Sequence, residues 1–120
     1  MLFVAAALCS ATCQAEDLAR TPVNDARPLL IAALAAEDGH AHGVLKNDVA
    51  DAITRRFEAT SPIYIDVTTQ RRYQQAGCAR LSVVFWQDGV KLPGQAAARR
   101  QTIEFALNYC LDGLPPKALR

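Results

Sequence analysis

Residues 78–110 read CARLSVVFWQDGVKLPGQAAARRQTIEFALNYC, and this stretch decides the fold. Two segments rich in β-branched and aromatic residues, 81–86 and 102–109, are separated by a connector that contains Pro93-Gly94. Such segments favour β-strands, and a Pro-Gly dipeptide is typical of a turn. The stretch therefore predicts a β-hairpin that bends at Pro93-Gly94.

The pairing register of this hairpin follows by counting outward from the bend. One face then carries the pairs Leu81–Leu107, Val83–Phe105 and Phe85–Ile103, and the other carries Trp86–Thr102, Val84–Glu104, Ser82–Ala106 and Arg80–Asn108. The same register places Cys78 opposite Cys110, so we predict a cross-strand disulfide between them. A slip of one residue would set apolar side chains opposite polar ones and separate the cysteines.

Three further elements are predicted before the hairpin. Residues 63–68 alternate between apolar and polar side chains, which predicts a strand that continues toward Tyr73. The apolar run within 24–39 predicts a short helix, and the amphipathic pattern of 47–59 predicts a second. The glycine-flanked segment 39–43 between these helices is predicted to be a flexible connector.

Together these elements predict an α+β fold. Two N-terminal helices are expected to pack on one face of a three-stranded antiparallel meander, which carries the cross-strand disulfide. The first helix would bury Leu30, Ala33 and Leu34. The expected core consists of apolar side chains from the second helix and from one sheet face, namely Ile53, Phe57, Ile65, Val67, Leu81, Val83, Phe85, Ile103, Phe105 and Leu107.

Length and charge bound the class of protein. The chain has 120 residues and no internal repeat, which is typical of one domain. Its formal net charge of +1 argues against nonspecific nucleic-acid binding. The uncharged run 2–8 and the small residues up to Ala15 predict a signal peptide over 1–15, although no Lys or Arg follows Met1. A periplasmic or secreted protein is expected, with no transmembrane segment in the mature chain.

The domain boundaries follow from this interpretation. Residues 16–26 are predicted to form a linker, 27–114 a single α+β domain and 115–120 a flexible tail. Two points stay open, the exact cleavage site and lipidation of Cys9 or Cys13, since neither cysteine has the usual flanking residues.

The sheet face opposite the core is the candidate binding surface. It is expected to present Tyr64, Arg72, Arg80, Val84 and Trp86, with Arg100 from the nearby connector, as a surface for a protein partner. Trp, Tyr and Arg are the residue types enriched at interface hot spots. The alternative is that residues 111–116 or the first helix fold over this face.

Other functional classes have less support in the sequence. No nucleophile lies near a base, no acid/base pair of carboxylates is evident and no phosphate-binding loop is present, so no enzyme activity and no cofactor are predicted. A secreted inhibitor or immunity-type protein that acts through the loop 88–100 is the alternative function. Metal binding by His40 and His42 is a third, although we predict no metal site. The oligomeric state stays open.

Two segments carry a resemblance to a known group of proteins. QAGCAR at 75–80 and NYCLDGLPP at 108–116 resemble parts of small exported proteins from bacterial conjugative and type IV secretion gene clusters. The resemblance covers the two ends of the hairpin and the general plan of helices and sheet. It implies an accessory role in the cell envelope.

Overall fold

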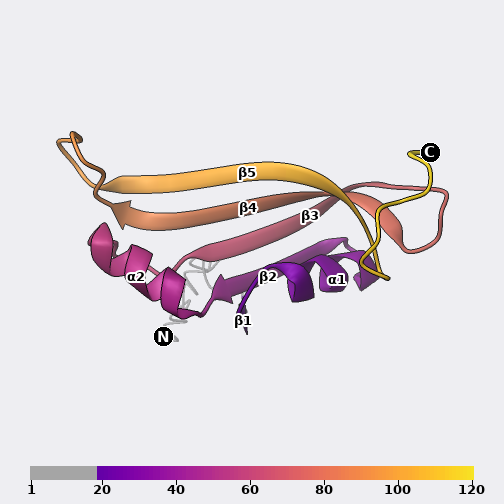
Figure 1. The fold of residues 1–120 in the computed structure, drawn as a ribbon, viewed down its shortest axis with the longest axis horizontal. Coiled ribbons are helices and arrows are strands. Elements are labelled where there is room, and N and C mark those ends of the chain that lie inside the picture. The colour runs from indigo at the N-terminus through magenta and orange to yellow at the C-terminus, as the bar shows by residue number, and fades with distance from the viewer. Residues whose placement is uncertain (1–18) are drawn as a thin grey trace, which may run out of the picture.

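The computed structural model describes residues 19–120 of the chain. Within these residues the chain forms two helices and five strands, in the order β1 (Thr21–Val23), α1 (Arg27–Ala35), β2 (His40–Leu45), α2 (Asp48–Arg56), β3 (Tyr64–Arg72), β4 (Cys78–Val90) and β5 (Arg99–Cys110). The strands make one mixed sheet in the order β1-β2-β3-β4-β5, in which β1 is parallel to β2 and the other neighbours are antiparallel. Figure 1 shows α1 alongside the sheet and α2 near one end of it.

The predicted three-stranded meander with two N-terminal helices is wrong, because β1 precedes α1 and β2 separates the helices. β1 lies in the segment predicted as a linker, and β2 occupies the segment predicted as a flexible connector. In β2, Ala41 is buried on the α1 side. A Cβ at Gly43 would lie 2.5 Å from Cδ1 of Leu29. The small residues that made this segment look like a loop are therefore what allows α1 to pack closely on the strand.

The hairpin register is confirmed throughout. Every predicted pair from Cys78–Cys110 to Trp86–Thr102 is present between β4 and β5. The predicted disulfide joins Cys78 and Cys110, whose Cα atoms are 4.0 Å apart. Both strands run further toward the bend than predicted, so the connector is reduced to residues 91–98.

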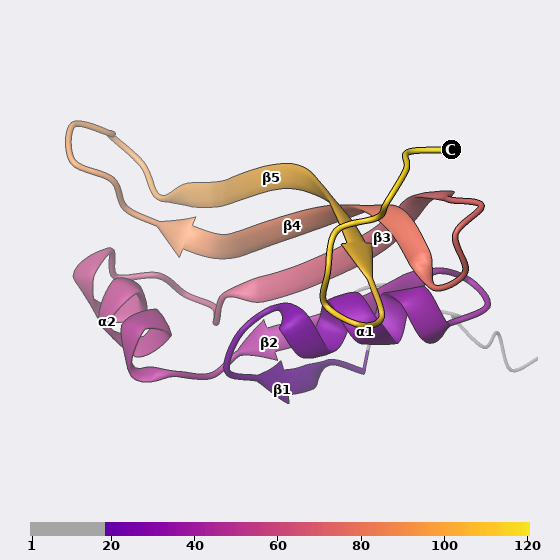
Figure 2. The same ribbon diagram turned by 45° about the vertical axis from the view of Figure 1, so that its right-hand side comes forward.

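Helix α1 provides the main cover of the sheet. Its buried residues Leu29, Leu30, Ala33 and Leu34 form one core with Ile65, Val67, Leu81 and Val83 of the sheet. Ile103 and Phe105 were predicted to belong to this core but are 67% and 46% exposed. The reason is that α2 lies at one end of the sheet, beside the end of β4, and does not cover β5 (Figure 2). Of the residues in α2, Ala50 alone is buried.

Polar contacts attach α2 and the segment that follows it to the end of β4. The buried side chain of Gln87 donates to Oγ1 of Thr54 (2.8 Å) and to the carbonyl of Ser61 (2.9 Å). Beside it, Gly89 has a positive φ of 67°, and a Cβ there would lie 2.3 Å from Oγ1 of Thr60. Gly89 therefore serves both the backbone conformation and the close approach of the two segments.

A β-bulge between Thr69 and Arg71 reverses the facing of the last residues of β3. Arg72 consequently lies on the α1 side, where its guanidinium donates to the carbonyls of Leu34 (3.0 Å) and Ala36 (2.9 Å). These carbonyls at the C-terminal end of α1 lack partners within the helix. The predicted position of Arg72 on the face opposite the core is therefore corrected. Arg72 supports the helix end.

Candidate functional site

The outer face of the sheet, which is the face opposite α1, gathers polar and aromatic side chains from four strands. Two cross-strand rows organise it, His42–Asp66–Val84–Glu104 and Val44–Tyr64–Trp86–Thr102. The rows are two residues apart on every strand, so their side chains share one face. The register thus brings Tyr64, Val84 and Trp86 together, as predicted.

Asp66 is the centre of a hydrogen-bond network on this face. Its Oδ1 accepts from Nδ1 of His42 (2.7 Å) and from the guanidinium of Arg20 (2.9 Å), and its Oδ2 accepts from the indole N–H of Trp86 (2.7 Å). Partial burial raises the pKa of Asp66, but the hydrogen bonds from His42, Trp86 and Arg20 outweigh it, so the pKa lies below its ordinary value. The carboxylate is therefore held in its charged form.

Arg20 is a member of this site that the sequence analysis missed. Its guanidinium lies over the ring of Tyr64, 4.5 Å from the centroid, and 5.4 Å from that of Trp86. It also donates to the carbonyl of Gly43 (3.1 Å). Arg20 lies just before β1, in the segment predicted as a linker, and no local pattern connects it with residues 45 positions away. Arg20, His42, Tyr64, Asp66 and Trp86 are referred to as the Asp66 cluster.

Trp86 is the aromatic centre of the cluster. Its ring centroid is 4.5 Å from that of Tyr64, and the guanidinium of Arg100 lies 4.1 Å from it. Arg100 is placed there by a bulge between Gln87 and Val90 of β4, which brings Asp88 beside it. The Nε of Arg100 donates to Oδ1 of Asp88 at 2.6 Å. Arg100, which was expected in the connector, therefore belongs to β5 and meets Trp86 on this face.

Arg80 lies further along the outer face, toward the disulfide. Its side chain is exposed and donates to Oδ1 of Asn108 at 3.4 Å. Because of the bulge in β3, Arg80 pairs with Arg71 across the strands. The guanidinium of Arg71 lies 5.5 Å from the ring of Tyr73. The outer face thus carries Arg71 in the place where Arg72 was predicted.

Neither α1 nor residues 111–116, the two segments that could have covered the outer face, lies over Trp86. Helix α1 packs on the opposite face. Leu111 begins a turn at the disulfide end of the hairpin, where its N–H donates to the carbonyl of Gly77 (2.9 Å). Trp86 and Tyr64 are accordingly half-buried by their neighbours in the cluster and open to solvent on the remaining side.

His40 and His42 also belong to the outer face. Their rings are nearly parallel, at 7°, with centroids 6.2 Å apart. Nδ1 of His42 contacts Asp66, and Nδ1 of His40 lies 3.3 Å from Oγ1 of Thr68. In residues 19–120 no group of three or more His, Cys, Asp or Glu side chains is placed to hold a metal ion. The two histidines are thus oriented by the sheet, without a complete ligand set around them.

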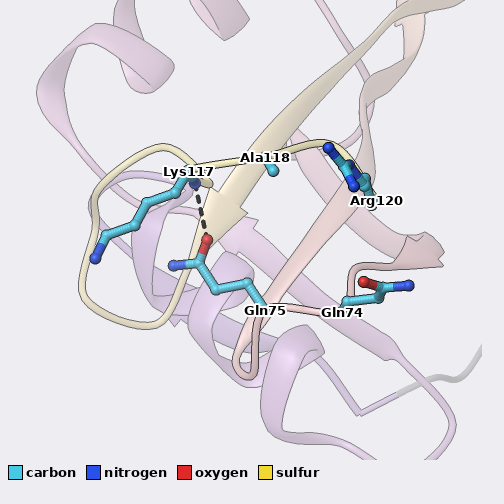
Figure 3. Close-up of a pocket in the computed structure, with 5 residues that line it drawn as sticks. All are labelled: Gln74, Gln75, Lys117, Ala118 and Arg120. Carbon is cyan, nitrogen blue, oxygen red and sulfur yellow. Dashed lines mark hydrogen bonds between the residues drawn. The ribbon is translucent and has the colours of Figure 1, made fainter.

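Of the hollows in the described chain, one adjoins the Asp66 cluster at Trp86 and another lies at the opposite end of the sheet. An apolar groove of about 380 Å³ is lined by α2 and the ends of β4 and β5, with Ile53, Phe57, Phe85 and Ile103 among its walls. A second hollow, of about 400 Å³, lies between the turn at Gln74-Gln75 and the C-terminal residues (Figure 3). There the N–H of Lys117 donates to Oε1 of Gln75 at 2.8 Å, which places the predicted tail against the turn.

Fold and site define a small α+β protein with one mixed sheet, a cross-strand disulfide and an ordered aromatic and charged cluster on its outer face. No helix within residues 19–120 has the length and apolar character needed to cross a membrane. The sequence matches no protein-family model, and searches for similar curated proteins and similar solved structures return no significant match. The function has to be inferred from the site itself.

Proposed function

We propose that this protein is a small exported binding protein that docks onto a larger cell-envelope assembly through its outer face. The observation that carries the proposal is the environment of Trp86, whose indole is fixed by Asp66 (2.7 Å) and flanked by Tyr64, Arg20 and Arg100. A large aromatic side chain held in one orientation loses little conformational entropy when a partner binds. Trp, Tyr and Arg also dominate interface hot spots.

The charges of the outer face indicate the chemistry of the partner. Asp66 neutralises Arg20, and Asp88 binds Arg100, so these two arginines are positioned near Trp86 but already paired. Arg71 and Arg80 pair across the strands toward the disulfide end, and within residues 19–120 neither belongs to an ion pair. A protein partner that presents acidic side chains beside an apolar contact for Trp86 would complement this face.

Export is supported by the Cys78–Cys110 disulfide, because such bonds persist in oxidising compartments and are rare in the cytosol. The predicted signal peptide, residues 1–15, lies outside the described residues 19–120. Docking in the cell envelope also fits the accessory role that the resemblance of segments 75–80 and 108–116 implies.

The proposal is tested by photo-crosslinking in living cells. A photoreactive amino acid at position 84, beside Trp86 on the outer face, should capture one defined partner in the periplasm, whereas the same group at the exposed position 49 of α2 should not. Adding Trp86→Ala or Arg80→Ala should reduce the yield at position 84 at least fivefold. Undiminished capture with both substitutions would remove this surface from consideration.

The alternative function is that of a secreted inhibitor or immunity-type protein that acts through the connector between β4 and β5. This alternative is supported by the position of the connector, which projects from one end of the sheet (Figure 1). The structure confines this connector to residues 91–98, since 88–90 and 99–100 belong to strands. Replacing 91–98 by a two-residue turn would leave the Asp66 cluster intact. Partner capture at position 84 that survives this replacement supports outer-face docking, and capture that disappears favours the loop.

A further inference from the structure

The free edge of β5 is the most exposed strand surface of the described chain. β5 is the last strand of the sheet, and residues 102–106 are all exposed. Figures 1 and 2 show no segment alongside the middle of this edge. Proteins usually protect such an edge with proline, lysine or a bulge. The stretch 101–109 contains neither residue type, and its pairing with β4 is regular.

The register shows which backbone groups of β5 are unpaired. The N–H of Leu111 donates to the carbonyl of Gly77, so this pair is hydrogen-bonded across the two strands. Hydrogen-bonded and non-hydrogen-bonded pairs alternate in an antiparallel ladder. The adjacent pair, Cys78–Cys110, is therefore non-bonded, which agrees with its short Cα separation of 4.0 Å. Along β5 the odd-numbered residues bond to β4, and the even-numbered residues from 102 to 108 direct their N–H and C=O groups to the free edge.

We infer that two copies of this protein associate by antiparallel pairing of their β5 edges, about a two-fold axis centred on Phe105. This register matches the direction of the free backbone groups, because Glu104 and Ala106 of opposite copies would form the hydrogen-bonded pairs. It sets Phe105 opposite Phe105, Ile103 opposite Leu107, Glu104 opposite Ala106 and Thr102 opposite Asn108 of the second copy. On the α1 side of this edge, Ile103, Phe105 and Leu107 thus each meet an apolar side chain.

Neighbouring registers are less favourable. Centring the axis on Glu104 would bring two carboxylates together, and centring it on Ile103 would set Phe105 opposite Gln101. Centring it on Ala106 would place the smallest side chain at the axis. In the inferred register the central Phe105 pair is non-hydrogen-bonded, the arrangement in which facing side chains come closest.

Charges and apolar contacts also favour a second copy as the occupant. At each end of the paired strands, Arg99 of one copy approaches the turn that carries Asp112 of the other, so opposite charges meet. Ile103, 67% exposed in one copy, meets Leu107, which packs against the α1 core of the other. These contacts add buried apolar area to the backbone pairing along the strand edge. Stable protein interfaces in general bury roughly 800 Å² per partner. The two copies would form one continuous sheet with both Asp66 clusters on the same side.

Sedimentation equilibrium of the protein purified from the periplasm tests the association. We expect a concentration-dependent dimer, and Ile103→Lys should weaken it at least tenfold while leaving the fold unchanged, since Ile103 is exposed in each copy. Ile31→Lys, which places the same charge at an exposed isoleucine of α1, is the matched control and should have no effect. A wild-type chain that stays monomeric at all soluble concentrations, or a dimer that Ile103→Lys leaves intact, would overturn the inference.

Disulfide trapping tests the register. Phe105→Cys should yield a covalent dimer under mild oxidation, because the two positions would face each other at a Cα separation of about 4.5 Å. Ile103→Cys is the control, since its two copies would be about 13 Å apart along the strands. Mass measurement confirms that Cys78–Cys110 is retained in each product. Trapping at position 103 without trapping at 105 would contradict the register.

Discussion

Two parts of one sheet carry the same alternation of apolar side chains but differ in how far these side chains are buried. In the covered region, under α1, Ile65, Val67, Leu81 and Val83 are completely buried. In the open region, formed by β5 and the end of β4, Ile103 and Phe105 continue the same face and stay exposed. The comparison teaches that alternation identifies which side chains share a face. Whether that face is buried depends on where the helices lie.

Removal of the disulfide should have the largest effect, because most of β5 lacks a helix over it and depends on β4. Replacing both Cys78 and Cys110 by alanine should lower the free energy of unfolding by about 3 to 4 kcal/mol, as expected for a bridge that closes a loop across 32 positions. Amide hydrogen exchange should rise more at Leu107 in β5 than at Val67 in β3. An equal rise at both positions would mean that the two regions are not energetically distinct.

A matched pair of truncations compares the two regions directly. Leu81→Ala removes a completely buried side chain and should cost about 3 kcal/mol of unfolding free energy. Ile103→Ala should change the stability of the monomer by less than about 0.5 kcal/mol, because that side chain is 67% exposed. Urea titration at low protein concentration measures both values. Similar losses would show that Ile103 is buried in solution even in the single copy.

Asp66→Asn tests the outer face of the covered region, with an expected loss of about 2 kcal/mol at neutral pH. The asparagine would present an N–H₂ group to one of the three donors that now contact the carboxylate. Because the pKa of Asp66 is lowered by folding, its charged form stabilises the protein fully above the ordinary value of 3.8. This contribution is lost as the pH falls below that value and through the lower pKa of the folded protein.

Urea titrations of the wild type and Asp66→Asn at a series of pH values should therefore converge at low pH. Glu37→Gln, at an exposed position of the connector after α1, is the control for removal of one negative charge. A difference between wild type and Asp66→Asn that is independent of pH would indicate that the network does not rely on the ionised carboxylate.

The hairpin could be predicted in detail because two constraints act on it together. The alternation of the two arms and the two cysteines agree on one register, and the structure follows it from Cys78 to Gln87 before a register shift next to the turn. The placement of Trp86 and Tyr64 on one face followed from the same alternation once the third strand was recognised, and their direct pairing is a finding of the structure. Helix α1 was predictable from its compact apolar run, whose stripe of Leu30, Ala33 and Leu34 is buried as expected.

The missed features lack a local signal. β2 is built from alternating histidine and small residues, which only a helix packed against Ala41 and Gly43 makes favourable. β1 is three residues long and is defined by its pairing with β2. Arg20 joins the Asp66 cluster through contacts across 46 positions, which no periodicity reveals. Sequence reasoning therefore found the aromatic half of the candidate site and missed its hydrogen-bonded centre.

The single extra residue between Thr69 and Arg71 determines which of two neighbouring arginines faces which side of the sheet. Arg71 is directed to the outer face, while Arg72 supports the end of α1. Gln70 is that extra residue, so deleting it would make the strand regular, with Thr69 opposite Leu81 and Arg71 opposite Arg80. Both guanidinium groups would then stay on their present sides of the sheet.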